Sequence, residues 1–173
     1  MPANKTYETQ RLLFRPTNTE DASFILALLN TPKWLKYIGN RQLNTVADAE
    51  AYIKNKMYPQ LERLGFANNT IIRKSDNIKI GTCGLYDREG LDGIDIGFAF
   101  LPQYEKQGYA FEASNKLKDV AINEFGITKI SGITTKDNTS SHKLLEKLGL
   151  KLMGPISLPN DDEELLLFEL KIH

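Results

Sequence analysis

Residue types that often mark a functional site are scarce in this sequence. Its 173 residues include one cysteine, Cys83, and two histidines, His142 and His173. A single cysteine cannot form an intramolecular disulfide, and two histidines without clustered acids predict no metal site. Cys83 lies in an apolar run typical of a strand, so we expect a small buried hydrophobic residue rather than a nucleophile.

An excess of either charge and long apolar segments are also missing. The formal net charge is zero, so the overall charge favours neither nucleic acid nor an anionic membrane surface as a partner. No stretch approaches the roughly 18 apolar residues of a membrane span, and residues 1–5 lack the apolar core of a signal peptide. We therefore expect a cytoplasmic protein, a monomer or a homodimer, with a single domain over residues 1–173.

The hydrophobic pattern that is present changes its period several times along the chain. Runs with strand-like composition alternate with segments whose apolar residues recur at helical spacing. The predicted strands cover residues 11–16, 69–73, 78–86, 94–101, 130–135, 150–156 and 165–172. The predicted helices lie between residues 18 and 32, 45 and 65, 108 and 126, and 138 and 149.

The connections between these elements predict the sheet. The strands at 69–73, 78–86 and 94–101 follow one another through short turns, which predicts an antiparallel meander. The helix after residue 108 leads on to the strand at 130–135, which predicts a right-handed parallel crossover. We expect an α+β fold in which about four helices flank a mixed, mostly antiparallel twisted sheet of about seven strands.

The second helix carries its own start and stop signals. Thr45 and Asp48 are spaced as in a capping box, so the helix is expected to begin there. Pro59 lies inside the apolar pattern and is expected to kink or split the helix before Gly65 ends it.

The segment from residue 95 to residue 113 is the best candidate for a binding site. It has the pattern of a buried strand, a polar turn and a helix that starts near Gly108. A turn that leads into a helix presents unpaired backbone N–H groups at the positive end of the helix dipole, which suits a phosphate. Gly108 and Ala110 are small enough for a phosphate to approach the backbone, and Lys106 adds a cation. The segment contains neither a Walker P-loop nor a dinucleotide-binding fingerprint.

Three motifs occur in a fixed order along the chain. TQRLLFR occupies residues 9–15, IGFAFLP and GYAFEA occupy residues 96–102 and 108–113, and NTSS and EKLGL occupy residues 138–141 and 146–150. In this order and spacing they resemble the GNAT N-acetyltransferase superfamily. The most similar branch includes the ribosomal-protein alanine and serine N-terminal acetyltransferases, and the resemblance covers nearly the whole chain.

The resemblance implies acetyl-CoA as the co-substrate and a primary amine as the acceptor. It places the pyrophosphate on the backbone amides of residues 106–111, and the pantetheine amides along the free edge of the strand at residues 98–100. It also implies that Asn138 hydrogen-bonds the pantetheine arm and that Ser141 lies near the thioester sulfur. The implied cofactor-binding residues are Phe98, Ala99, Phe100, Lys106, Gln107, Gly108, Tyr109, Ala110, Phe111 and Asn138.

Two departures from the family pattern bear on the chemistry. The turn often begins with Gln or Arg, where this chain has Glu105, and a carboxylate beside a pyrophosphate is unfavourable unless it points away. Many members place a tyrosine, as general acid, where this chain has Leu145, so tyrosine chemistry from that position is excluded. Ser141 is then the candidate that hydrogen-bonds or protonates the leaving sulfur, the alternative being a helix-capping role beside Asn138.

Asp95 is the candidate general base because it lies on the central strand near the expected acyl centre. A proton relayed through water is the main alternative. Alternation places Asp95 on the face opposite Ile96 and Phe98, and the pattern leaves open whether that face meets a cleft or solvent. His142, beside Ser141, is interpreted as a surface or capping residue.

The acceptor is not identified by the sequence, which is compatible with a protein N-terminus, a polyamine or amino acid, or an aminoglycoside-like drug. Trp34 and Tyr37, in a predicted loop after Pro32, and Tyr52 are either core residues or the lining of an acceptor pocket. The acidic run at residues 161–164 is either a solvated turn or a rim that attracts a cationic amine. The alternative function is a non-catalytic module that binds acyl-CoA as a sensor or to recruit a partner.

Overall fold

A computed structural model describes residues 5–173; residues 1–4, on which the expectation about a signal peptide partly rests, lie outside this range. Within it, eight strands form one sheet in the order β1-β2-β3-β4-β5-β6-β8-β7. They are β1 (Tyr7–Glu8), β2 (Leu12–Pro16), β3 (Asn68–Arg73), β4 (Ile78–Tyr86), β5 (Ile94–Phe100), β6 (Lys129–Thr134), β7 (Lys151–Ile156) and β8 (Leu165–Lys171). The seven predicted strands are confirmed. The additional strand, β1, has only two residues, which is too short to show a period.

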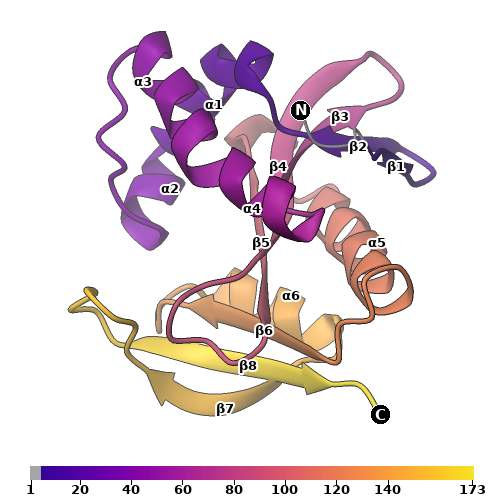
Figure 1. The fold of residues 1–173 in the computed structure, drawn as a ribbon, viewed down its shortest axis with the longest axis vertical. Helices are drawn as coiled ribbons and strands as arrows, with labels where there is room; N and C mark the ends of the chain where they lie inside the picture. The colour runs from indigo at the N-terminus through magenta and orange to yellow at the C-terminus, as the bar shows by residue number, and fades with distance from the viewer. Residues whose placement is uncertain (1–4) are drawn as a thin grey trace.

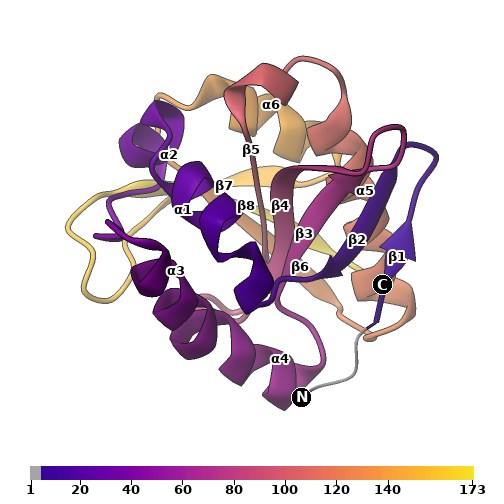
Figure 2. The ribbon, with the colours of Figure 1, turned by 90° about the horizontal axis from the view of Figure 1, so that it is seen from above.

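Helices cover both faces of the sheet, which confirms the expected α+β class (Figures 1 and 2). They are η1 (Thr19–Asp21), α1 (Ala22–Leu29), α2 (Pro32–Tyr37), α3 (Val46–Tyr52), the π-helical η2 (Ile53–Met57), α4 (Tyr58–Leu64), η3 (Pro102–Tyr104), α5 (Tyr109–Asn123) and α6 (Thr139–Lys147). The group from α1 to α4 lies over one face, and α5 and α6 lie over the other (Figure 2). Within residues 5–173, no helix combines the length and the apolar character needed to cross a membrane.

The loop expected after Pro32 is instead the helix α2, so that expectation is wrong. Thr31 caps this helix by accepting a hydrogen bond from the backbone N–H of Trp34, and Pro32 occupies its first turn. A proline is favourable there because the first turn of a helix needs no N–H donor. Trp34 and Tyr37 therefore project from a helix rather than from a loop.

The second predicted helix begins and ends as expected. The capping box between Thr45 and Asp48 is present, and Gly65 ends α4 with a left-handed φ of +83°. The helix is divided at the π-helical turn η2, directly before the first turn of α4, which contains Pro59. The wider turn accommodates a proline that cannot donate the usual hydrogen bond to the residue four positions earlier.

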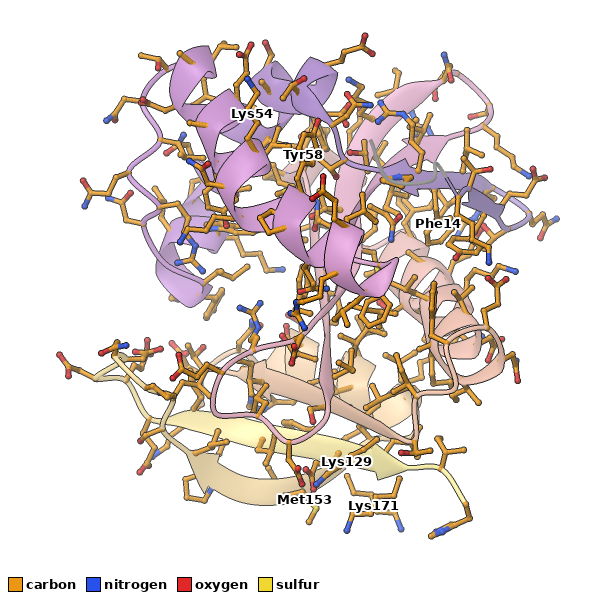
Figure 3. All side chains as sticks on the ribbon, viewed as in Figure 1. Phe14, Lys54, Tyr58, Lys129, Met153 and Lys171 are labelled. Atoms are coloured by element: carbon orange, nitrogen blue, oxygen red, sulfur yellow. The ribbon has the colours of Figure 1, made fainter. Side chains whose placement is uncertain are left out.

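The main core lies between the sheet and α5. Phe14, which is completely buried, lies between β2 and α5 (Figure 3), and Ala113, Leu117 and Ala121 of α5 pack in the same cluster. Cys83 of β4 also belongs to this cluster, and burial raises the pKa of its thiol to about 12. The expectation of a structural cysteine is thus confirmed, since a protonated, enclosed thiol is a poor nucleophile.

β5 and β6 form the parallel pair that the crossover predicts, but they pair over two residues only. Ile94 lies opposite Ile130 and Asp95 opposite Ser131, whereas the other edge of β6 pairs with β8 along its whole length. The close approach at this point needs a glycine, because a Cβ on Gly93 would lie 2.6 Å from Ser131 Oγ. Beyond Asp95 the two strands diverge and leave one backbone edge of β5 without a partner strand within the described residues.

Candidate active site

The turn between β5 and α5 leaves the first amides of a helix without acceptors. Gly108 is the N-cap of α5 with φ +83°, and no side chain caps the helix. The first backbone bond of the helix runs from the N–H of Glu112 to the carbonyl oxygen of Gly108 at 3.1 Å. Among residues 5–173, the N–H groups of Tyr109, Ala110 and Phe111 therefore have no acceptor, and they lie at the positive end of the dipole of a 15-residue helix. This arrangement suits an anion.

Residues of the N-terminal hairpin hold this turn in place. Glu112 accepts hydrogen bonds from the Thr9 hydroxyl and, at 3.0 Å, from the backbone N–H of Arg11. Arg11 Nη1 donates to the carbonyl oxygen of Gln107 at 3.0 Å, and the guanidinium lies 4.3 Å from the ring centroid of Tyr109. The motif at residues 9–15 and the motif at residues 108–113 thus form one structural unit.

The unpaired edge of β5 leads from this turn to Asp95. Side chains on this strand alternate: Phe98 and Phe100 pack against the α5 core, whereas Ala99 packs against the cluster formed by α1 and α3. The backbone of residues 96–100 pairs with β4 on one side only. At ~3.3 Å per residue these five residues span about 16 Å. An extended ligand that binds in the turn and lies along this edge would end beside Asp95.

Asp95 is buried beneath an arginine at the point where β5 and β6 diverge. Its side chain is 3% exposed, and Arg88 Nε donates to Oδ2 at 2.5 Å. Arg88 in turn lies over the ring of Tyr86, at 4.9 Å from the centroid. Burial raises the pKa of Asp95 to about 6, although the guanidinium of Arg88 opposes the shift. A carboxyl group with such a pKa is ionised at neutral pH and well matched to accepting a proton.

Asp95 lies on the same face of β5 as Ala99, which is the face covered by the group from α1 to α4. Its cross-strand neighbours on this face are Tyr86 of β4 and Ser131 of β6. The Tyr86 hydroxyl donates to Asn68 Oδ1, and burial raises the pKa of Tyr86 well above its usual range, so the phenol stays protonated. The buried Ser131 hydroxyl has no hydrogen-bond partner within residues 5–173.

The family model of the GNAT acetyltransferase domain matches residues 11–151. The chain belongs to the GNAT acetyltransferase family. It is 30% identical over 154 residues to the uncharacterized N-acetyltransferase p20 of Bacillus licheniformis, covering 87% of this chain and 84% of that protein. It is 26% identical over 148 residues to the uncharacterized N-acetyltransferase YoaA of Bacillus subtilis, covering 85% and 83%. These similarities identify the protein as an acetyltransferase.

A solved structure extends the similarity of the fold to a ribosomal-protein acetyltransferase. RimL, a ribosomal L7/L12 alpha-N-protein acetyltransferase in complex with coenzyme A, has a TM-score of 0.81 at 16% identity. The superposition covers 97% of this chain and 98% of that chain. The branch expected from the motifs is therefore among the structural neighbours of this GNAT protein.

The late GNAT motif forms the start of α6. Asn138 Oδ1 accepts the backbone N–H of Ser141 at 3.4 Å, so Asn138, not Ser141, is the helix cap. The Ser141 hydroxyl is half-buried and has no hydrogen-bond partner within residues 5–173. His142 Nε2 lies 3.0 Å from the carbonyl oxygen of Thr135 and ties the helix to the end of β6.

The two predicted catalytic residues come from the two strands that diverge. Asp95 belongs to β5, at the point where that strand still pairs with β6, and Ser141 lies in the first turn of α6, which begins after the C-terminal end of β6. No hydrogen bond in the described part of the chain joins the two side chains.

Both departures from the GNAT pattern have a structural counterpart. The Glu105 carboxylate lies 3.0 Å from Lys33 Nζ of α2, so its charge is paired with a cation outside the turn. Leu145 is 2% exposed and packs on β6, where a Cβ on Gly132 would lie 2.6 Å from its Cδ2. At the position where many family members have a tyrosine, this chain therefore has a buried leucine that belongs to the core.

The aromatic candidates for an acceptor pocket belong mainly to the second core. Trp34 and Tyr52 are half-buried and pack against the cluster of α1 and α3. Tyr52 is also close enough to Tyr86 and Arg88 to interact with them electrostatically. Tyr37 is half-buried beneath Lys36, whose Nζ lies 4.8 Å from the ring centroid.

The acidic run 161–164 is an exposed turn between β7 and β8. Glu164 is paired with Lys136 at 2.5 Å. This connection contacts the β4–β5 turn, because a Cβ on Gly90 would lie 2.6 Å from Pro159 Cδ. The acidic turn thus lies next to the segment that carries Arg88.

Sequence reasoning missed Arg88, Tyr86 and Ser131. One signal was available: two strands that end at residue 86 and restart at residue 94 place Tyr86 opposite Asp95, as observed. No signal in the sequence indicated that Arg88 folds back onto Asp95, because that contact depends on the shape of the intervening turn.

Proposed function

We propose that this protein transfers the acetyl group of acetyl-CoA to a primary amine by direct attack within a ternary complex. One observation carries the proposal: the free amides of α5, the unpaired edge of β5 and the buried carboxylate of Asp95 follow one another in space. Membership of the GNAT acetyltransferase family and the similarity of the fold to the CoA complex of RimL support it.

The donor would bind in two parts. The backbone amides of residues 106–111 would hold the pyrophosphate, and the backbone edge at residues 98–100 would pair with the pantetheine amides like an added strand. Asn138 uses its Oδ1 atom for the helix cap, so its Nδ2 group is available to donate to the pantetheine arm. The pairing of Glu105 with Lys33 offsets the negative charge of Glu105 beside this site.

The reaction needs a free amine and a protonated leaving group. The Asp95 carboxylate, directly or through a water molecule, would take a proton from the acceptor ammonium. The amine nitrogen then attacks the thioester carbonyl carbon and the C–S bond breaks. The nitrogen gives up its second proton, which reaches the departing thiolate through the Ser141 hydroxyl or through solvent. Positioning of the two substrates supplies much of the acceleration.

Two measurements on the purified protein test this function. Calorimetric titration with acetyl-CoA reports donor binding, and the release of free CoA thiol across a panel of primary amines reports transfer. Amine-dependent thiol release is the expected result. Binding without any amine-dependent release would contradict transfer and favour a non-catalytic acyl-CoA-binding module, whereas absence of binding would contradict the donor assignment.

A further inference from the structure

We infer that the acceptor is a zwitterionic amine, with an anionic group a few bonds from its amino group, and that Arg88 binds this anionic group. The inference rests on the proposed acetyl transfer and goes beyond it by naming the chemical class of the acceptor.

The guanidinium of Arg88 is held in place, yet part of its hydrogen-bonding capacity remains available. Its Nε atom donates to Asp95 at 2.5 Å, its Cζ atom lies 4.9 Å from the ring centroid of Tyr86, and Pro159 lies close to its turn at Gly90. Neither Nη atom has a hydrogen-bond partner among residues 5–173, and the side chain is 39% exposed. Arg88 therefore presents two donors in a fixed orientation to an incoming molecule.

Arg88 also lies where the acceptor must arrive. Asp95 is the last residue of β5 that pairs with β6, and the free edge that would guide the thioester begins directly after it. Arg88 and Asp95 lie on the same face of the sheet, opposite α5. An amine that attacks the thioester at this end meets a carboxylate and a guanidinium together.

The pair selects the charges of its ligand. A planar guanidinium binds a carboxylate or phosphate through two parallel hydrogen bonds, whereas the Asp95 carboxylate attracts an ammonium group. Because the two side chains are in direct contact, the matching charges on the ligand must be a few bonds apart. A free amino acid and an acidic N-terminal residue satisfy this condition. A polyamine would place a second cation against Arg88.

The exposed acidic turn at residues 161–164 favours a different acceptor, because its negative charges would attract a polycation. Glu164 is already paired with Lys136, and the other carboxylates are solvated at the surface. Arg88 is closer to the proposed reaction centre, so its preference is expected to dominate.

The test compares matched acceptors at saturating acetyl-CoA. Glycine and L-serine are each assayed against the corresponding α-carboxamide, the tripeptide amide Asp-Gly-Gly-NH2 against Asn-Gly-Gly-NH2, and spermidine is included as a polyamine. We expect kcat/KM for carboxylate-bearing acceptors to exceed that of their neutral partners by at least about tenfold. The carboxamides have less basic amines, which favours them intrinsically, so the comparison is stringent.

Arg88→Lys keeps a positive charge beside Asp95 but removes the planar fork. The carboxylate-to-carboxamide ratio is expected to fall to about one in this variant, mainly through a higher KM for the carboxylate acceptors. Arg63→Lys is the matched control, because Arg63 forms an exposed surface pair with Asp87, and it is expected to keep the ratio of the parent protein.

The outcomes separate the two proposals. Equal kcat/KM for carboxylates and carboxamides, or a preference for spermidine, would overturn the inference and leave acetyl transfer intact. Absence of turnover with every amine would contradict the proposed function itself. The comparison among acceptors uses the parent protein, so it is decisive even if Arg88→Lys does not fold.

Discussion

Arg11 and Glu112 are 101 residues apart in the sequence, yet Arg11 Nε lies 2.6 Å from Glu112 Oε1. The pair connects the N-terminal hairpin with the first turn of α5, whose amides would hold the pyrophosphate. The Glu112 side chain is only 20% exposed, so its hydrogen bonds are partly shielded from water. A motif at the start of the chain therefore supports a binding turn far along the sequence.

Replacing Glu112 with Gln tests this connection. The loss of charge weakens the bonds from Thr9 and Arg11 and is expected to cost about 1 kcal/mol of unfolding free energy, or about 2–4 °C in Tm. The dissociation constant of CoA is also expected to rise severalfold. Glu8→Gln is the control. Glu8 lies on β1 and forms an exposed ion pair with Lys74, so this change is expected to leave CoA binding unchanged. Unaltered CoA affinity in Glu112→Gln would show that the pair does not position the turn.

Asp95 determines the expected pH dependence. Burial raises the pKa of this carboxyl group to about 6, so the basic form is lost as the pH falls through that value. We expect kcat/KM to fall by about tenfold per pH unit below the pKa. Asp95→Asn is expected to abolish this acidic limb of the pH–rate profile together with most of the activity. Asp92→Asn changes an exposed acid of the same turn and is expected to retain the limb. A limb that persists in Asp95→Asn would assign the proton to water or to another group.

Asp21 has a structural role, and its pKa is shifted in the opposite direction to that of Asp95. Although burial opposes ionisation, hydrogen bonds from Arg15 and Lys79 lower the pKa of Asp21 to about 2. Its folded pKa lies below the ordinary value of 3.8, so its contribution to stability is complete above pH 3.8 and is lost as the pH falls toward 2. Asp21→Asn leaves the cationic partners without a counter-charge and is expected to lower the unfolding free energy by about 3–5 kcal/mol.

Denaturant titrations across this pH range measure the Asp21 effect. Asp76→Asn, which breaks the ion pair with Arg73 near the surface, is the matched control, and a much smaller loss is expected. Equal losses in the two variants would contradict the special role of the buried site.

Ser141 is the candidate residue for protonation of the leaving thiolate. We expect Ser141→Ala to lower kcat by about 10²-fold with little change in the KM for acetyl-CoA. Ser140→Ala removes a neighbouring exposed hydroxyl, which bonds Asn138, and serves as the control. Equal kcat values for the parent protein and Ser141→Ala would assign protonation of the thiolate to solvent.

Much of the fold followed from local signals. The capping box at Thr45, the left-handed glycine at Gly65 and the strand periods around Cys83 each act within a few residues, and each is confirmed. Expectations were wrong where one residue permits two local outcomes. Pro32 can follow a helix or begin one, and the cap by Thr31 decides for the helix α2.

The family, the order of the elements and the strand–turn–helix segment at residues 95–113 could be predicted from the sequence, because the motifs and the periods that carry them are short-range. The point where β5 and β6 diverge, the contact of Arg88 with Asp95 and the contact of Arg11 with Glu112 could be seen only in the folded chain. Each of these depends on strand register and on the path of a turn. A shift of one residue would turn every side chain of a strand to the other face, so such contacts are settled by packing across the whole sheet.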